Sequence, residues 1–180
     1  MTEYVTSEPL TGEDVRELRN LLGFTQKELA GFLNCSKRTV ENWESDSGKV
    51  TGPAAALIGM LLRWPGMAEK MEIPARSTGL RVWYYYRSRV CSVLDVDEIR
   101  RTVKVYNYTD DPLYRAFGIN TEPSFEDYEE FLESRCFPRT RDKMKLQLKE
   151  LNIPFYDPEM IIEKTEGRMA GDEFHVRMER

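Results

Sequence analysis

Apolar residues recur at helical spacing near the start of the chain. Val15, Leu18 and Leu22 are three or four positions apart, which places them on one face of an α-helix. A threonine followed three residues later by an acidic residue opens this run and the next one, at Thr11 and Thr25. That spacing is the pattern of a capping box, so two helices are predicted to begin at these positions.

Two further helices follow in the same segment. Ser36 is placed to cap a third helix, whose inner residues Val40 and Trp43 are three positions apart. Pro53 suits the first turn of a fourth, Ala54–Leu62, because a proline there removes no helical hydrogen bond. This fourth helix is apolar nearly all round, so it needs cover on more than one side, from the core or from a partner subunit.

The pattern changes after residues 65–80, which combine proline, glycine and charge and are predicted to form a short helix and a linker. Apolar and polar residues then alternate as they do in strands, at Arg81–Arg87, Val90–Val96 and Arg101–Tyr108. A tight turn is expected at Ser88–Arg89, between the first two strands.

The last third of the chain returns to helical spacing. Ser124 opens a predicted helix that runs through Arg135, and Thr140 is expected to cap another that runs through Leu151. A short apolar helix should follow Pro158, and residues 173–178 suit a closing strand.

These elements predict an α+β fold in two domains. An N-terminal all-α domain of four to five helices occupies residues 1–66, and a linker covers 67–80. Residues 81–180 form a small α+β domain with an antiparallel sheet. The boundaries are read from the composition of the linker and the change of period.

Composition narrows the classes of function. The 180 residues are 41% apolar and 32% charged, as in ordinary soluble proteins. The longest apolar run, 54–62, is too short to span a bilayer, and the first ten residues are unlike a signal peptide. We therefore expect a cytoplasmic protein that does not enter membranes.

Reactive and metal-binding side chains are sparse. Cys35, Cys91 and Cys136 are scattered without a CxxC pair, and His175 is the only histidine. A zinc site needs clustered Cys and His ligands, and a cysteine nucleophile needs a nearby base. The sequence therefore favours three packing cysteines, and we expect no metal, no cofactor and no enzyme activity.

Charge does not favour nonspecific coating of nucleic acid, because the net charge is −5. Residues 1–77 hold 9 basic and 11 acidic side chains, so that half of the chain is nearly balanced. A specific interface would require the basic residues to gather on one face.

Two capped helices separated by a very short turn form the helix-turn-helix unit, which places its second helix in the major groove of DNA. If Val40 and Trp43 face the core, basic and polar residues at the start of that helix face outward. Lysine and arginine donate to guanine, and threonine offers a hydroxyl and a methyl group. Polar side chains around the starts of the two helices suit phosphate oxygens. The residues expected to contact DNA are Gln26, Lys27, Ser36, Lys37, Arg38, Thr39, Asn42 and Lys49.

Each of these residues also has a plainer interpretation. Ser36 is fully explained as a helix cap, and Lys37 and Arg38 would otherwise be a solvated face. Glu41 and Glu44 are expected to cap or to pair internally, because carboxylates repel phosphate unless they read a cytosine.

The run Phe24–Glu44, FTQKELAGFLNCSKRTVENWE, resembles the XRE (Cro/C1-type repressor) family. Gly52–Leu57 and Trp64–Gly66 are similar to its antitoxin-type branch. One difference is the loop Ser45–Gly48, which is more acidic than the usual glycine-lysine turn. The resemblance implies a transcriptional regulator, a repressor or autoregulator, that reads duplex DNA as a homodimer, with half-sites about 34 Å apart.

The second domain carries weaker resemblances. Residues 131–142 and 167–172 resemble part of the N-terminal region of HipA-type persistence kinases, without the kinase's catalytic motifs, so no phosphotransfer is implied. The aromatic run Arg81–Arg87 could stack single-stranded bases or pack in a core. A basic patch around Arg135–Lys145 could engage a phosphate or the acidic helix before it. Residues 81–180 could bind a protein partner, which leaves open an alternative function as an antitoxin or anti-defence inhibitor that autoregulates its operon.

Overall fold

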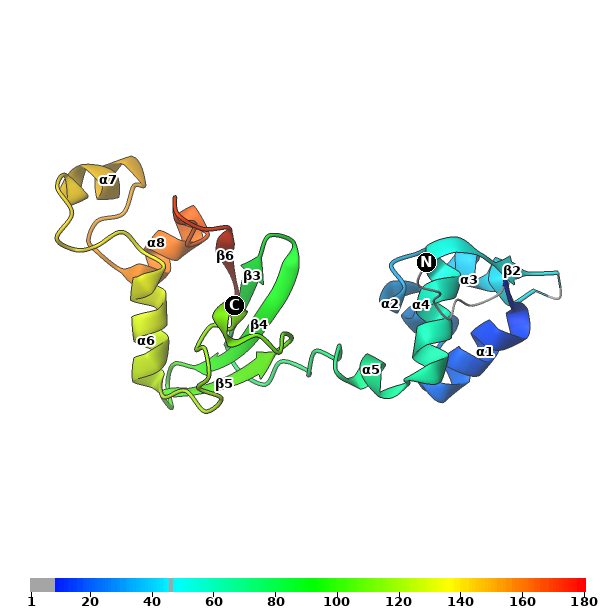
Figure 1. The fold of residues 1–180 in the computed structure, drawn as a ribbon. Helices are drawn as coiled ribbons and strands as arrows, with labels where there is room; N and C mark the ends of the chain where they lie inside the picture. The colour runs from blue at the N-terminus through cyan, green and yellow to red at the C-terminus, as the bar shows by residue number, and fades with distance from the viewer. Residues whose placement is uncertain (1–8, 46) are drawn as a thin grey trace, which may run out of the picture. The chain divides into compact units, whose positions relative to one another are not determined.

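The computed structural model describes residues 9–45 and 47–180, which separate into two compact units, Met1–Glu72 and Ile73–Arg180. The division falls within the segment 67–80 that the sequence predicts to be a linker. The N-terminal unit is helical and the C-terminal unit contains a four-stranded antiparallel sheet, as the α+β prediction requires (Figure 1).

The described residues of the N-terminal unit form five helices and one very short ladder. Their bounds are α1 Gly12–Leu21, α2 Gln26–Phe32, α3 Lys37–Trp43, α4 Gly52–Arg63, α5 Gly66–Glu69, β1 Leu10–Thr11 and β2 Lys49–Val50. Complete capping boxes start α1 and α2, at Thr11 and Thr25, as predicted. Helix α1 ends before Gly23, whose φ of +68° suits glycine best.

The core of this unit comes from the apolar positions that set the helical pattern. Val15, Leu18, Leu29 and Val40 are fully buried, and α4 adds Ile58 and Leu61 to the same cluster. The ladder between β1 and β2 was not predicted, because two-residue strands leave no alternation to detect. The loop before β2 lies against the end of α3, where a side chain on Gly48 would collide with the Trp43 carbonyl.

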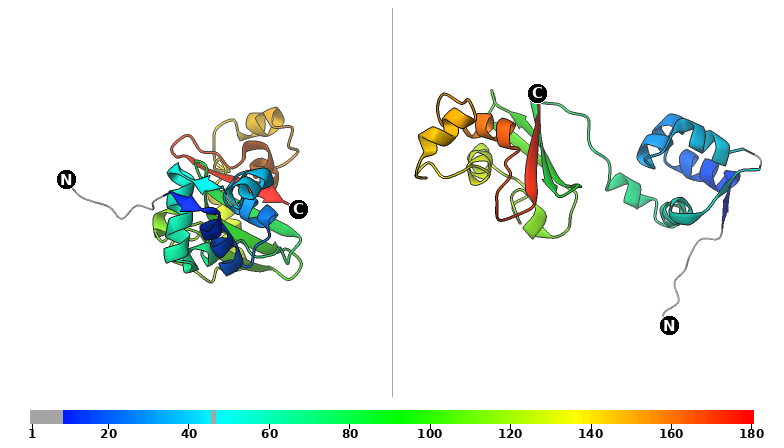
Figure 2. Two further views of the ribbon diagram at one scale, coloured as in Figure 1. Left: turned by 90° about the vertical axis from the view of Figure 1, so that its right-hand side faces the viewer. Right: turned by 90° about the horizontal axis from the view of Figure 1, so that it is seen from above.

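The C-terminal unit has strand order β5-β4-β3-β6, with all neighbours antiparallel. The strands are β3 Leu80–Tyr86, β4 Arg89–Asp97, β5 Thr102–Asn107 and β6 Phe174–Glu179. The helices are α6 Phe125–Ser134, α7 Met144–Glu150, α8 Pro158–Thr165 and the 3-10 turn η1 Pro112–Tyr114. Helices α6 and α8 cover one face of the sheet, which holds the core of this unit (Figures 1 and 2).

The aromatic strand β3 divides its side chains between the two faces of the sheet. Tyr84 and Tyr86 pack with the core cluster under the helices. On the other face, Tyr85 stacks on His175 at 4.8 Å between ring centroids, and Arg177 lies over the rings of Trp83 and Tyr85. Trp83 and Tyr85 therefore contact other rings and a guanidinium on the face away from the core, whereas Tyr84 and Tyr86 pack in the core.

One predicted helix start is wrong. Thr140 lies in a turn, where the Arg141 N–H donates to the Pro138 carbonyl, and α7 begins only at Met144. Lys143, directly before α7, has a φ of 64° and gives no side-chain cap. The turn that follows Pro138 interrupts the helical path, so a threonine at the right spacing has no helix to cap.

Candidate nucleic-acid interface

Helix α3 packs on the core through one side only. Val40 is fully buried, and Trp43 is half-buried against the same cluster. At 3.6 residues per turn, Arg38 and Asn42 lie about 160° around the helix from Val40. Both are exposed, so the outward face expected from the sequence is present.

Lys37 and Arg38, the two basic residues of α3, differ in the partners that their side chains have. Lys37 forms an ion pair with Glu41, at 2.7 Å between Nζ and Oε1, and both side chains are about half exposed. Arg38 forms no hydrogen bond or ion pair with any other residue that the structure describes. Its five donors are therefore free for a ligand, and guanine O6 and N7 are the acceptors that arginine matches best.

Ser36 caps α3 through its hydroxyl group. Ser36 Oγ accepts a hydrogen bond from the Thr39 N–H at 3.1 Å, and the two hydroxyls lie 2.8 Å apart. Lys27 is exposed on α2, and Lys49 is exposed on β2 opposite Thr11. Contacts of these four residues with DNA stay predictions, while the capping by Ser36 is observed.

Gln26 is not a free side chain. Its Nε2 donates to Glu44 Oε2 at 2.8 Å, and Arg19 Nε donates to the other oxygen of the same carboxylate at 2.7 Å. Arg16 also donates to the backbone carbonyl of Glu44. A phosphate contact by the Gln26 side chain would have to use the remaining amide N–H.

Glu44 thus joins the first three helices at one buried carboxylate, which is 7% exposed. Burial alone would raise the pKa of Glu44. Hydrogen bonds from Arg19 and Gln26, with the charges of Arg19 and Arg16, outweigh burial and hold the pKa below its usual value. The prediction that Glu44 pairs internally is confirmed, but no local pattern identifies Arg19, 25 residues earlier, as its partner.

The arginine-rich end of the C-terminal unit is tied into the fold. The Arg135 guanidinium donates two hydrogen bonds, of 2.7 and 3.0 Å, to the carboxylate of Asp172. It also donates to the backbone carbonyls of Gly167 and Phe174. A side chain on Gly167 would approach the Cβ of Arg135 to 3.1 Å. These contacts join the end of α6 to the segment that leads into strand β6.

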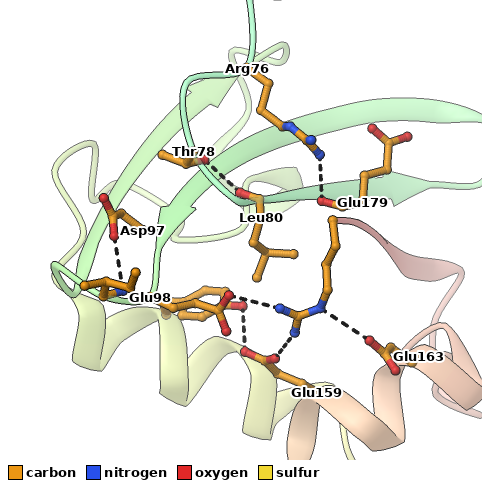
Figure 3. A network of polar contacts seen from close by, with 11 residues as sticks. Arg76, Thr78, Leu80, Asp97, Glu98, Glu159, Glu163 and Glu179 are labelled. Carbon is orange, nitrogen blue, oxygen red and sulfur yellow. Dashed lines mark hydrogen bonds and ion pairs between the residues drawn. The ribbon is translucent and has the colours of Figure 1, made fainter.

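Acidic residues near α8 gather around Arg180 (Figure 3). Its guanidinium pairs with Glu98 at 2.9 Å, with Glu159, and with Glu163 at 3.7 Å. Burial raises the pKa of Glu159, although the charge of Arg180 opposes that shift. Tyr128 donates to the same carboxylate at 3.4 Å. These carboxylates are neutralised within the protein rather than presented to a substrate.

Cys136 is buried in the core of the C-terminal unit. Burial raises the pKa of Cys136 to about 12, which disfavours the thiolate that a nucleophile needs. Residues 9–45 and 47–180 contain no group of three or more His, Cys, Asp or Glu side chains that could hold a metal ion. Within the same residues, no helix is both long and apolar enough to cross a membrane.

Comparison with known proteins agrees with this geometry. The family model described as Helix-turn-helix matches residues 15–60, which lie wholly in the N-terminal unit and include α2 and α3. A search of curated proteins gave no match to the chain. Residues 15–60 are therefore similar to helix-turn-helix domains, the unit that the sequence predicts there.

Proposed function

We propose that this chain is a sequence-specific regulator of transcription that reads the major groove of duplex DNA with α3, as a homodimer. The observation that carries the proposal is the outward face of α3, where Arg38 and Asn42 are exposed opposite the buried Val40. Arginine reads guanine and asparagine reads adenine through paired hydrogen bonds. Lys27 and Lys49 would add phosphate contacts that position the helix.

A homodimer is proposed because one recognition helix makes few base contacts, whereas two-fold dimers read two half-sites about one helical turn apart. The N-terminal unit offers a surface for this. Its exposed stripe consists of four apolar side chains, Leu57 and Met60 on α4, Trp64 just after α4 and Met67 on α5, each of which is more than a third exposed. A second copy of the chain, packed on this stripe, would remove these side chains from water.

The test begins with selection of bound fragments from the source genome, followed by affinity measurements at fixed salt. Arg38→Ala should weaken binding to the selected site by about 1–3 kcal/mol and relax one base position. Lys70→Ala, which removes an exposed charge at the end of α5, is the matched control. If Arg38→Ala and Lys37→Ala both bind as tightly as the wild type, α3 is not the recognition helix.

The dimer has its own test. Met60→Glu places a charge on the exposed stripe, and sedimentation at micromolar concentration should then show monomers instead of dimers. Wild-type protein that sediments as a monomer while it binds a two-fold site would contradict the homodimer.

A second candidate function gives the C-terminal unit the primary role, as an antitoxin-like or anti-defence inhibitor of a protein partner whose helix-turn-helix domain autoregulates its operon. The observation that favours a protein partner is an exposed groove beside α7, described below.

A further inference from the structure

The C-terminal unit carries an apolar groove along α7 and the segment that follows it. The groove has a volume of about 540 Å³, within the usual range for a binding pocket. Its floor includes Leu148 and Ile153, which are 7% and 4% exposed. Phe155 also lines the groove and is 60% exposed, so its ring is accessible to a partner side chain.

Lysines border this groove on one side. Lys145 and Lys149 are one turn apart on α7 and line it together with Met144 and Leu148. Both lysines are exposed, and neither forms an ion pair with another described residue. Glu150 lies on another side of α7, about 100° around the helix from Lys149, so it does not face the groove.

The other basic residues of this region separate into two groups. Arg135 pairs with Asp172, and Arg139 pairs with Glu133 while it lies 4.5 Å from the centre of the Tyr156 ring. Arg141, by contrast, forms no side-chain bond with a described residue. Among the residues that line the groove, the charged ones are Lys145 and Lys149, so its own lining is positive.

We infer that this groove, with Lys145 and Lys149 at its edge and Phe155 at its rim, is the docking site for an acidic segment of a protein partner that inserts bulky apolar side chains. Charge complementarity selects an acidic occupant, and the buried apolar floor selects one with apolar anchors. DNA phosphates would satisfy the lysines but leave Phe155 and the floor uncovered. A flat bilayer would not fill a concave groove. The inference rests on the groove itself, names the kind of partner that the second candidate function would need, and is independent of operator recognition.

The experiment uses the full chain and a fluorescent helical peptide that carries glutamate on all sides except one stripe of leucine and phenylalanine. The same peptide with lysine in place of glutamate is the matched probe. We expect saturable binding of the acidic peptide only. Lys145→Glu combined with Lys149→Glu should weaken it at least about tenfold, and Phe155→Ser should weaken it severalfold at unchanged net charge.

Two control measurements keep this result specific. Lys164→Glu makes the same kind of charge change on α8, outside the groove, and should bind the acidic peptide within about twofold of the wild type. Operator affinity should be unchanged in Phe155→Ser. Loss of peptide binding with operator binding intact would then isolate the groove from the helix-turn-helix domain.

Three outcomes overturn the inference. The acidic peptide fails to saturate the wild-type protein up to millimolar concentration, or Lys164→Glu weakens it as much as the groove variants do. In the third outcome, the wild-type protein co-sediments with phosphatidylserine vesicles, the variant that lacks Lys145 and Lys149 does not, and the peptide fails to bind. The surface then binds a membrane instead of a protein.

Discussion

Arg38 on α3 and four arginines of the C-terminal unit differ in what surrounds them. In the C-terminal unit, Arg81, Arg101, Arg135 and Arg139 all pair with carboxylates, and the Arg81–Asp95 pair is buried with hydrogen bonds of 2.6 and 2.8 Å. On α3, the Arg38 side chain has no such partner among the described residues. An arginine already held by a carboxylate stabilises the fold, whereas one left in solvent can bind a ligand.

This difference changes how arginine-rich motifs in the chain are interpreted. The sequence shows arginines both in the helix-turn-helix run and around residues 135–141, and the local pattern does not separate them. Partners from distant segments do so, since Asp172 is 37 residues from Arg135. The four predictions that follow test this contrast, from the largest expected change to the smallest.

Arg135→Ala should destabilise the C-terminal unit by about 3–5 kcal/mol, because it removes one partner of a largely buried pair and leaves two carbonyls without a donor. Hydrogen exchange followed by mass spectrometry would assign the loss to this unit. Arg141→Ala, at an exposed position without a side-chain partner, should change stability by no more than about 0.5 kcal/mol. Equal effects of the two substitutions would remove the distinction between held and free arginines.

Glu44→Ala should destabilise the N-terminal unit by about 2–4 kcal/mol, since Arg19 and Gln26 then lose their shared acceptor. Protection of α1–α3 in hydrogen exchange is the measurement. Glu41→Ala is the matched control, because its ion pair with Lys37 is exposed and contributes only about 0.3–0.5 kcal/mol. A Glu44→Ala protein as stable as Glu41→Ala would show that the buried carboxylate does not hold the helices together.

Acid should weaken both units through carboxylates with lowered pKa. Hydrogen bonds from Arg135 lower the pKa of Asp172, and that of Glu44 is lowered despite its burial. A group with a depressed folded pKa contributes full stability above its unfolded pKa and loses it as pH falls through the folded one. Stability of the N-terminal unit should therefore fall below about pH 4.5. Glu44→Gln should flatten this slope in urea titrations at successive pH values, and an unchanged slope would assign the acid sensitivity to other carboxyls.

Lys37→Ala should have the smallest effect on folding, at most about 0.5 kcal/mol, because it breaks one exposed i,i+4 pair. Operator binding should nonetheless weaken, with the salt slope reduced by about one if Lys37 meets a phosphate. Urea unfolding and affinity at several salt concentrations measure the two effects. A stability loss that matches the affinity loss would mean that Lys37 acts through the fold.

Much of the N-terminal unit could be predicted because its signals are local. The caps at Thr11, Thr25 and Ser36 satisfy donors three residues away, and the core positions of α1–α3 follow the helical repeat. The outward position of Arg38 follows from the burial of Val40. The sequence did not predict the ladder between β1 and β2, because neither strand is long enough to show an alternation of apolar and polar residues.

The C-terminal unit was predicted less completely because its organisation depends on distant pairs. The strands were identified from alternation, but nothing local places β6 beside β3 or makes it an edge of the sheet. Thr140 was misread because a capping residue needs the backbone after it to be helical. The left-handed conformation at Lys143 is visible only in the structure.

Short-range order came from the amino-acid sequence: the helix starts, the apolar faces, the alternating strands and the helix-turn-helix run. These depend on residues within about one or two turns of each other, so neighbours in the chain suffice. Only the tertiary structure decided which charged side chains pair with a carboxylate inside the fold, as Arg135 does, and which stay exposed to a ligand, as Arg38 does. These long-range salt bridges and hydrogen bonds form between groups that are tens of residues apart in the sequence. Folding brings such groups together, so no local sequence pattern predicts the pair.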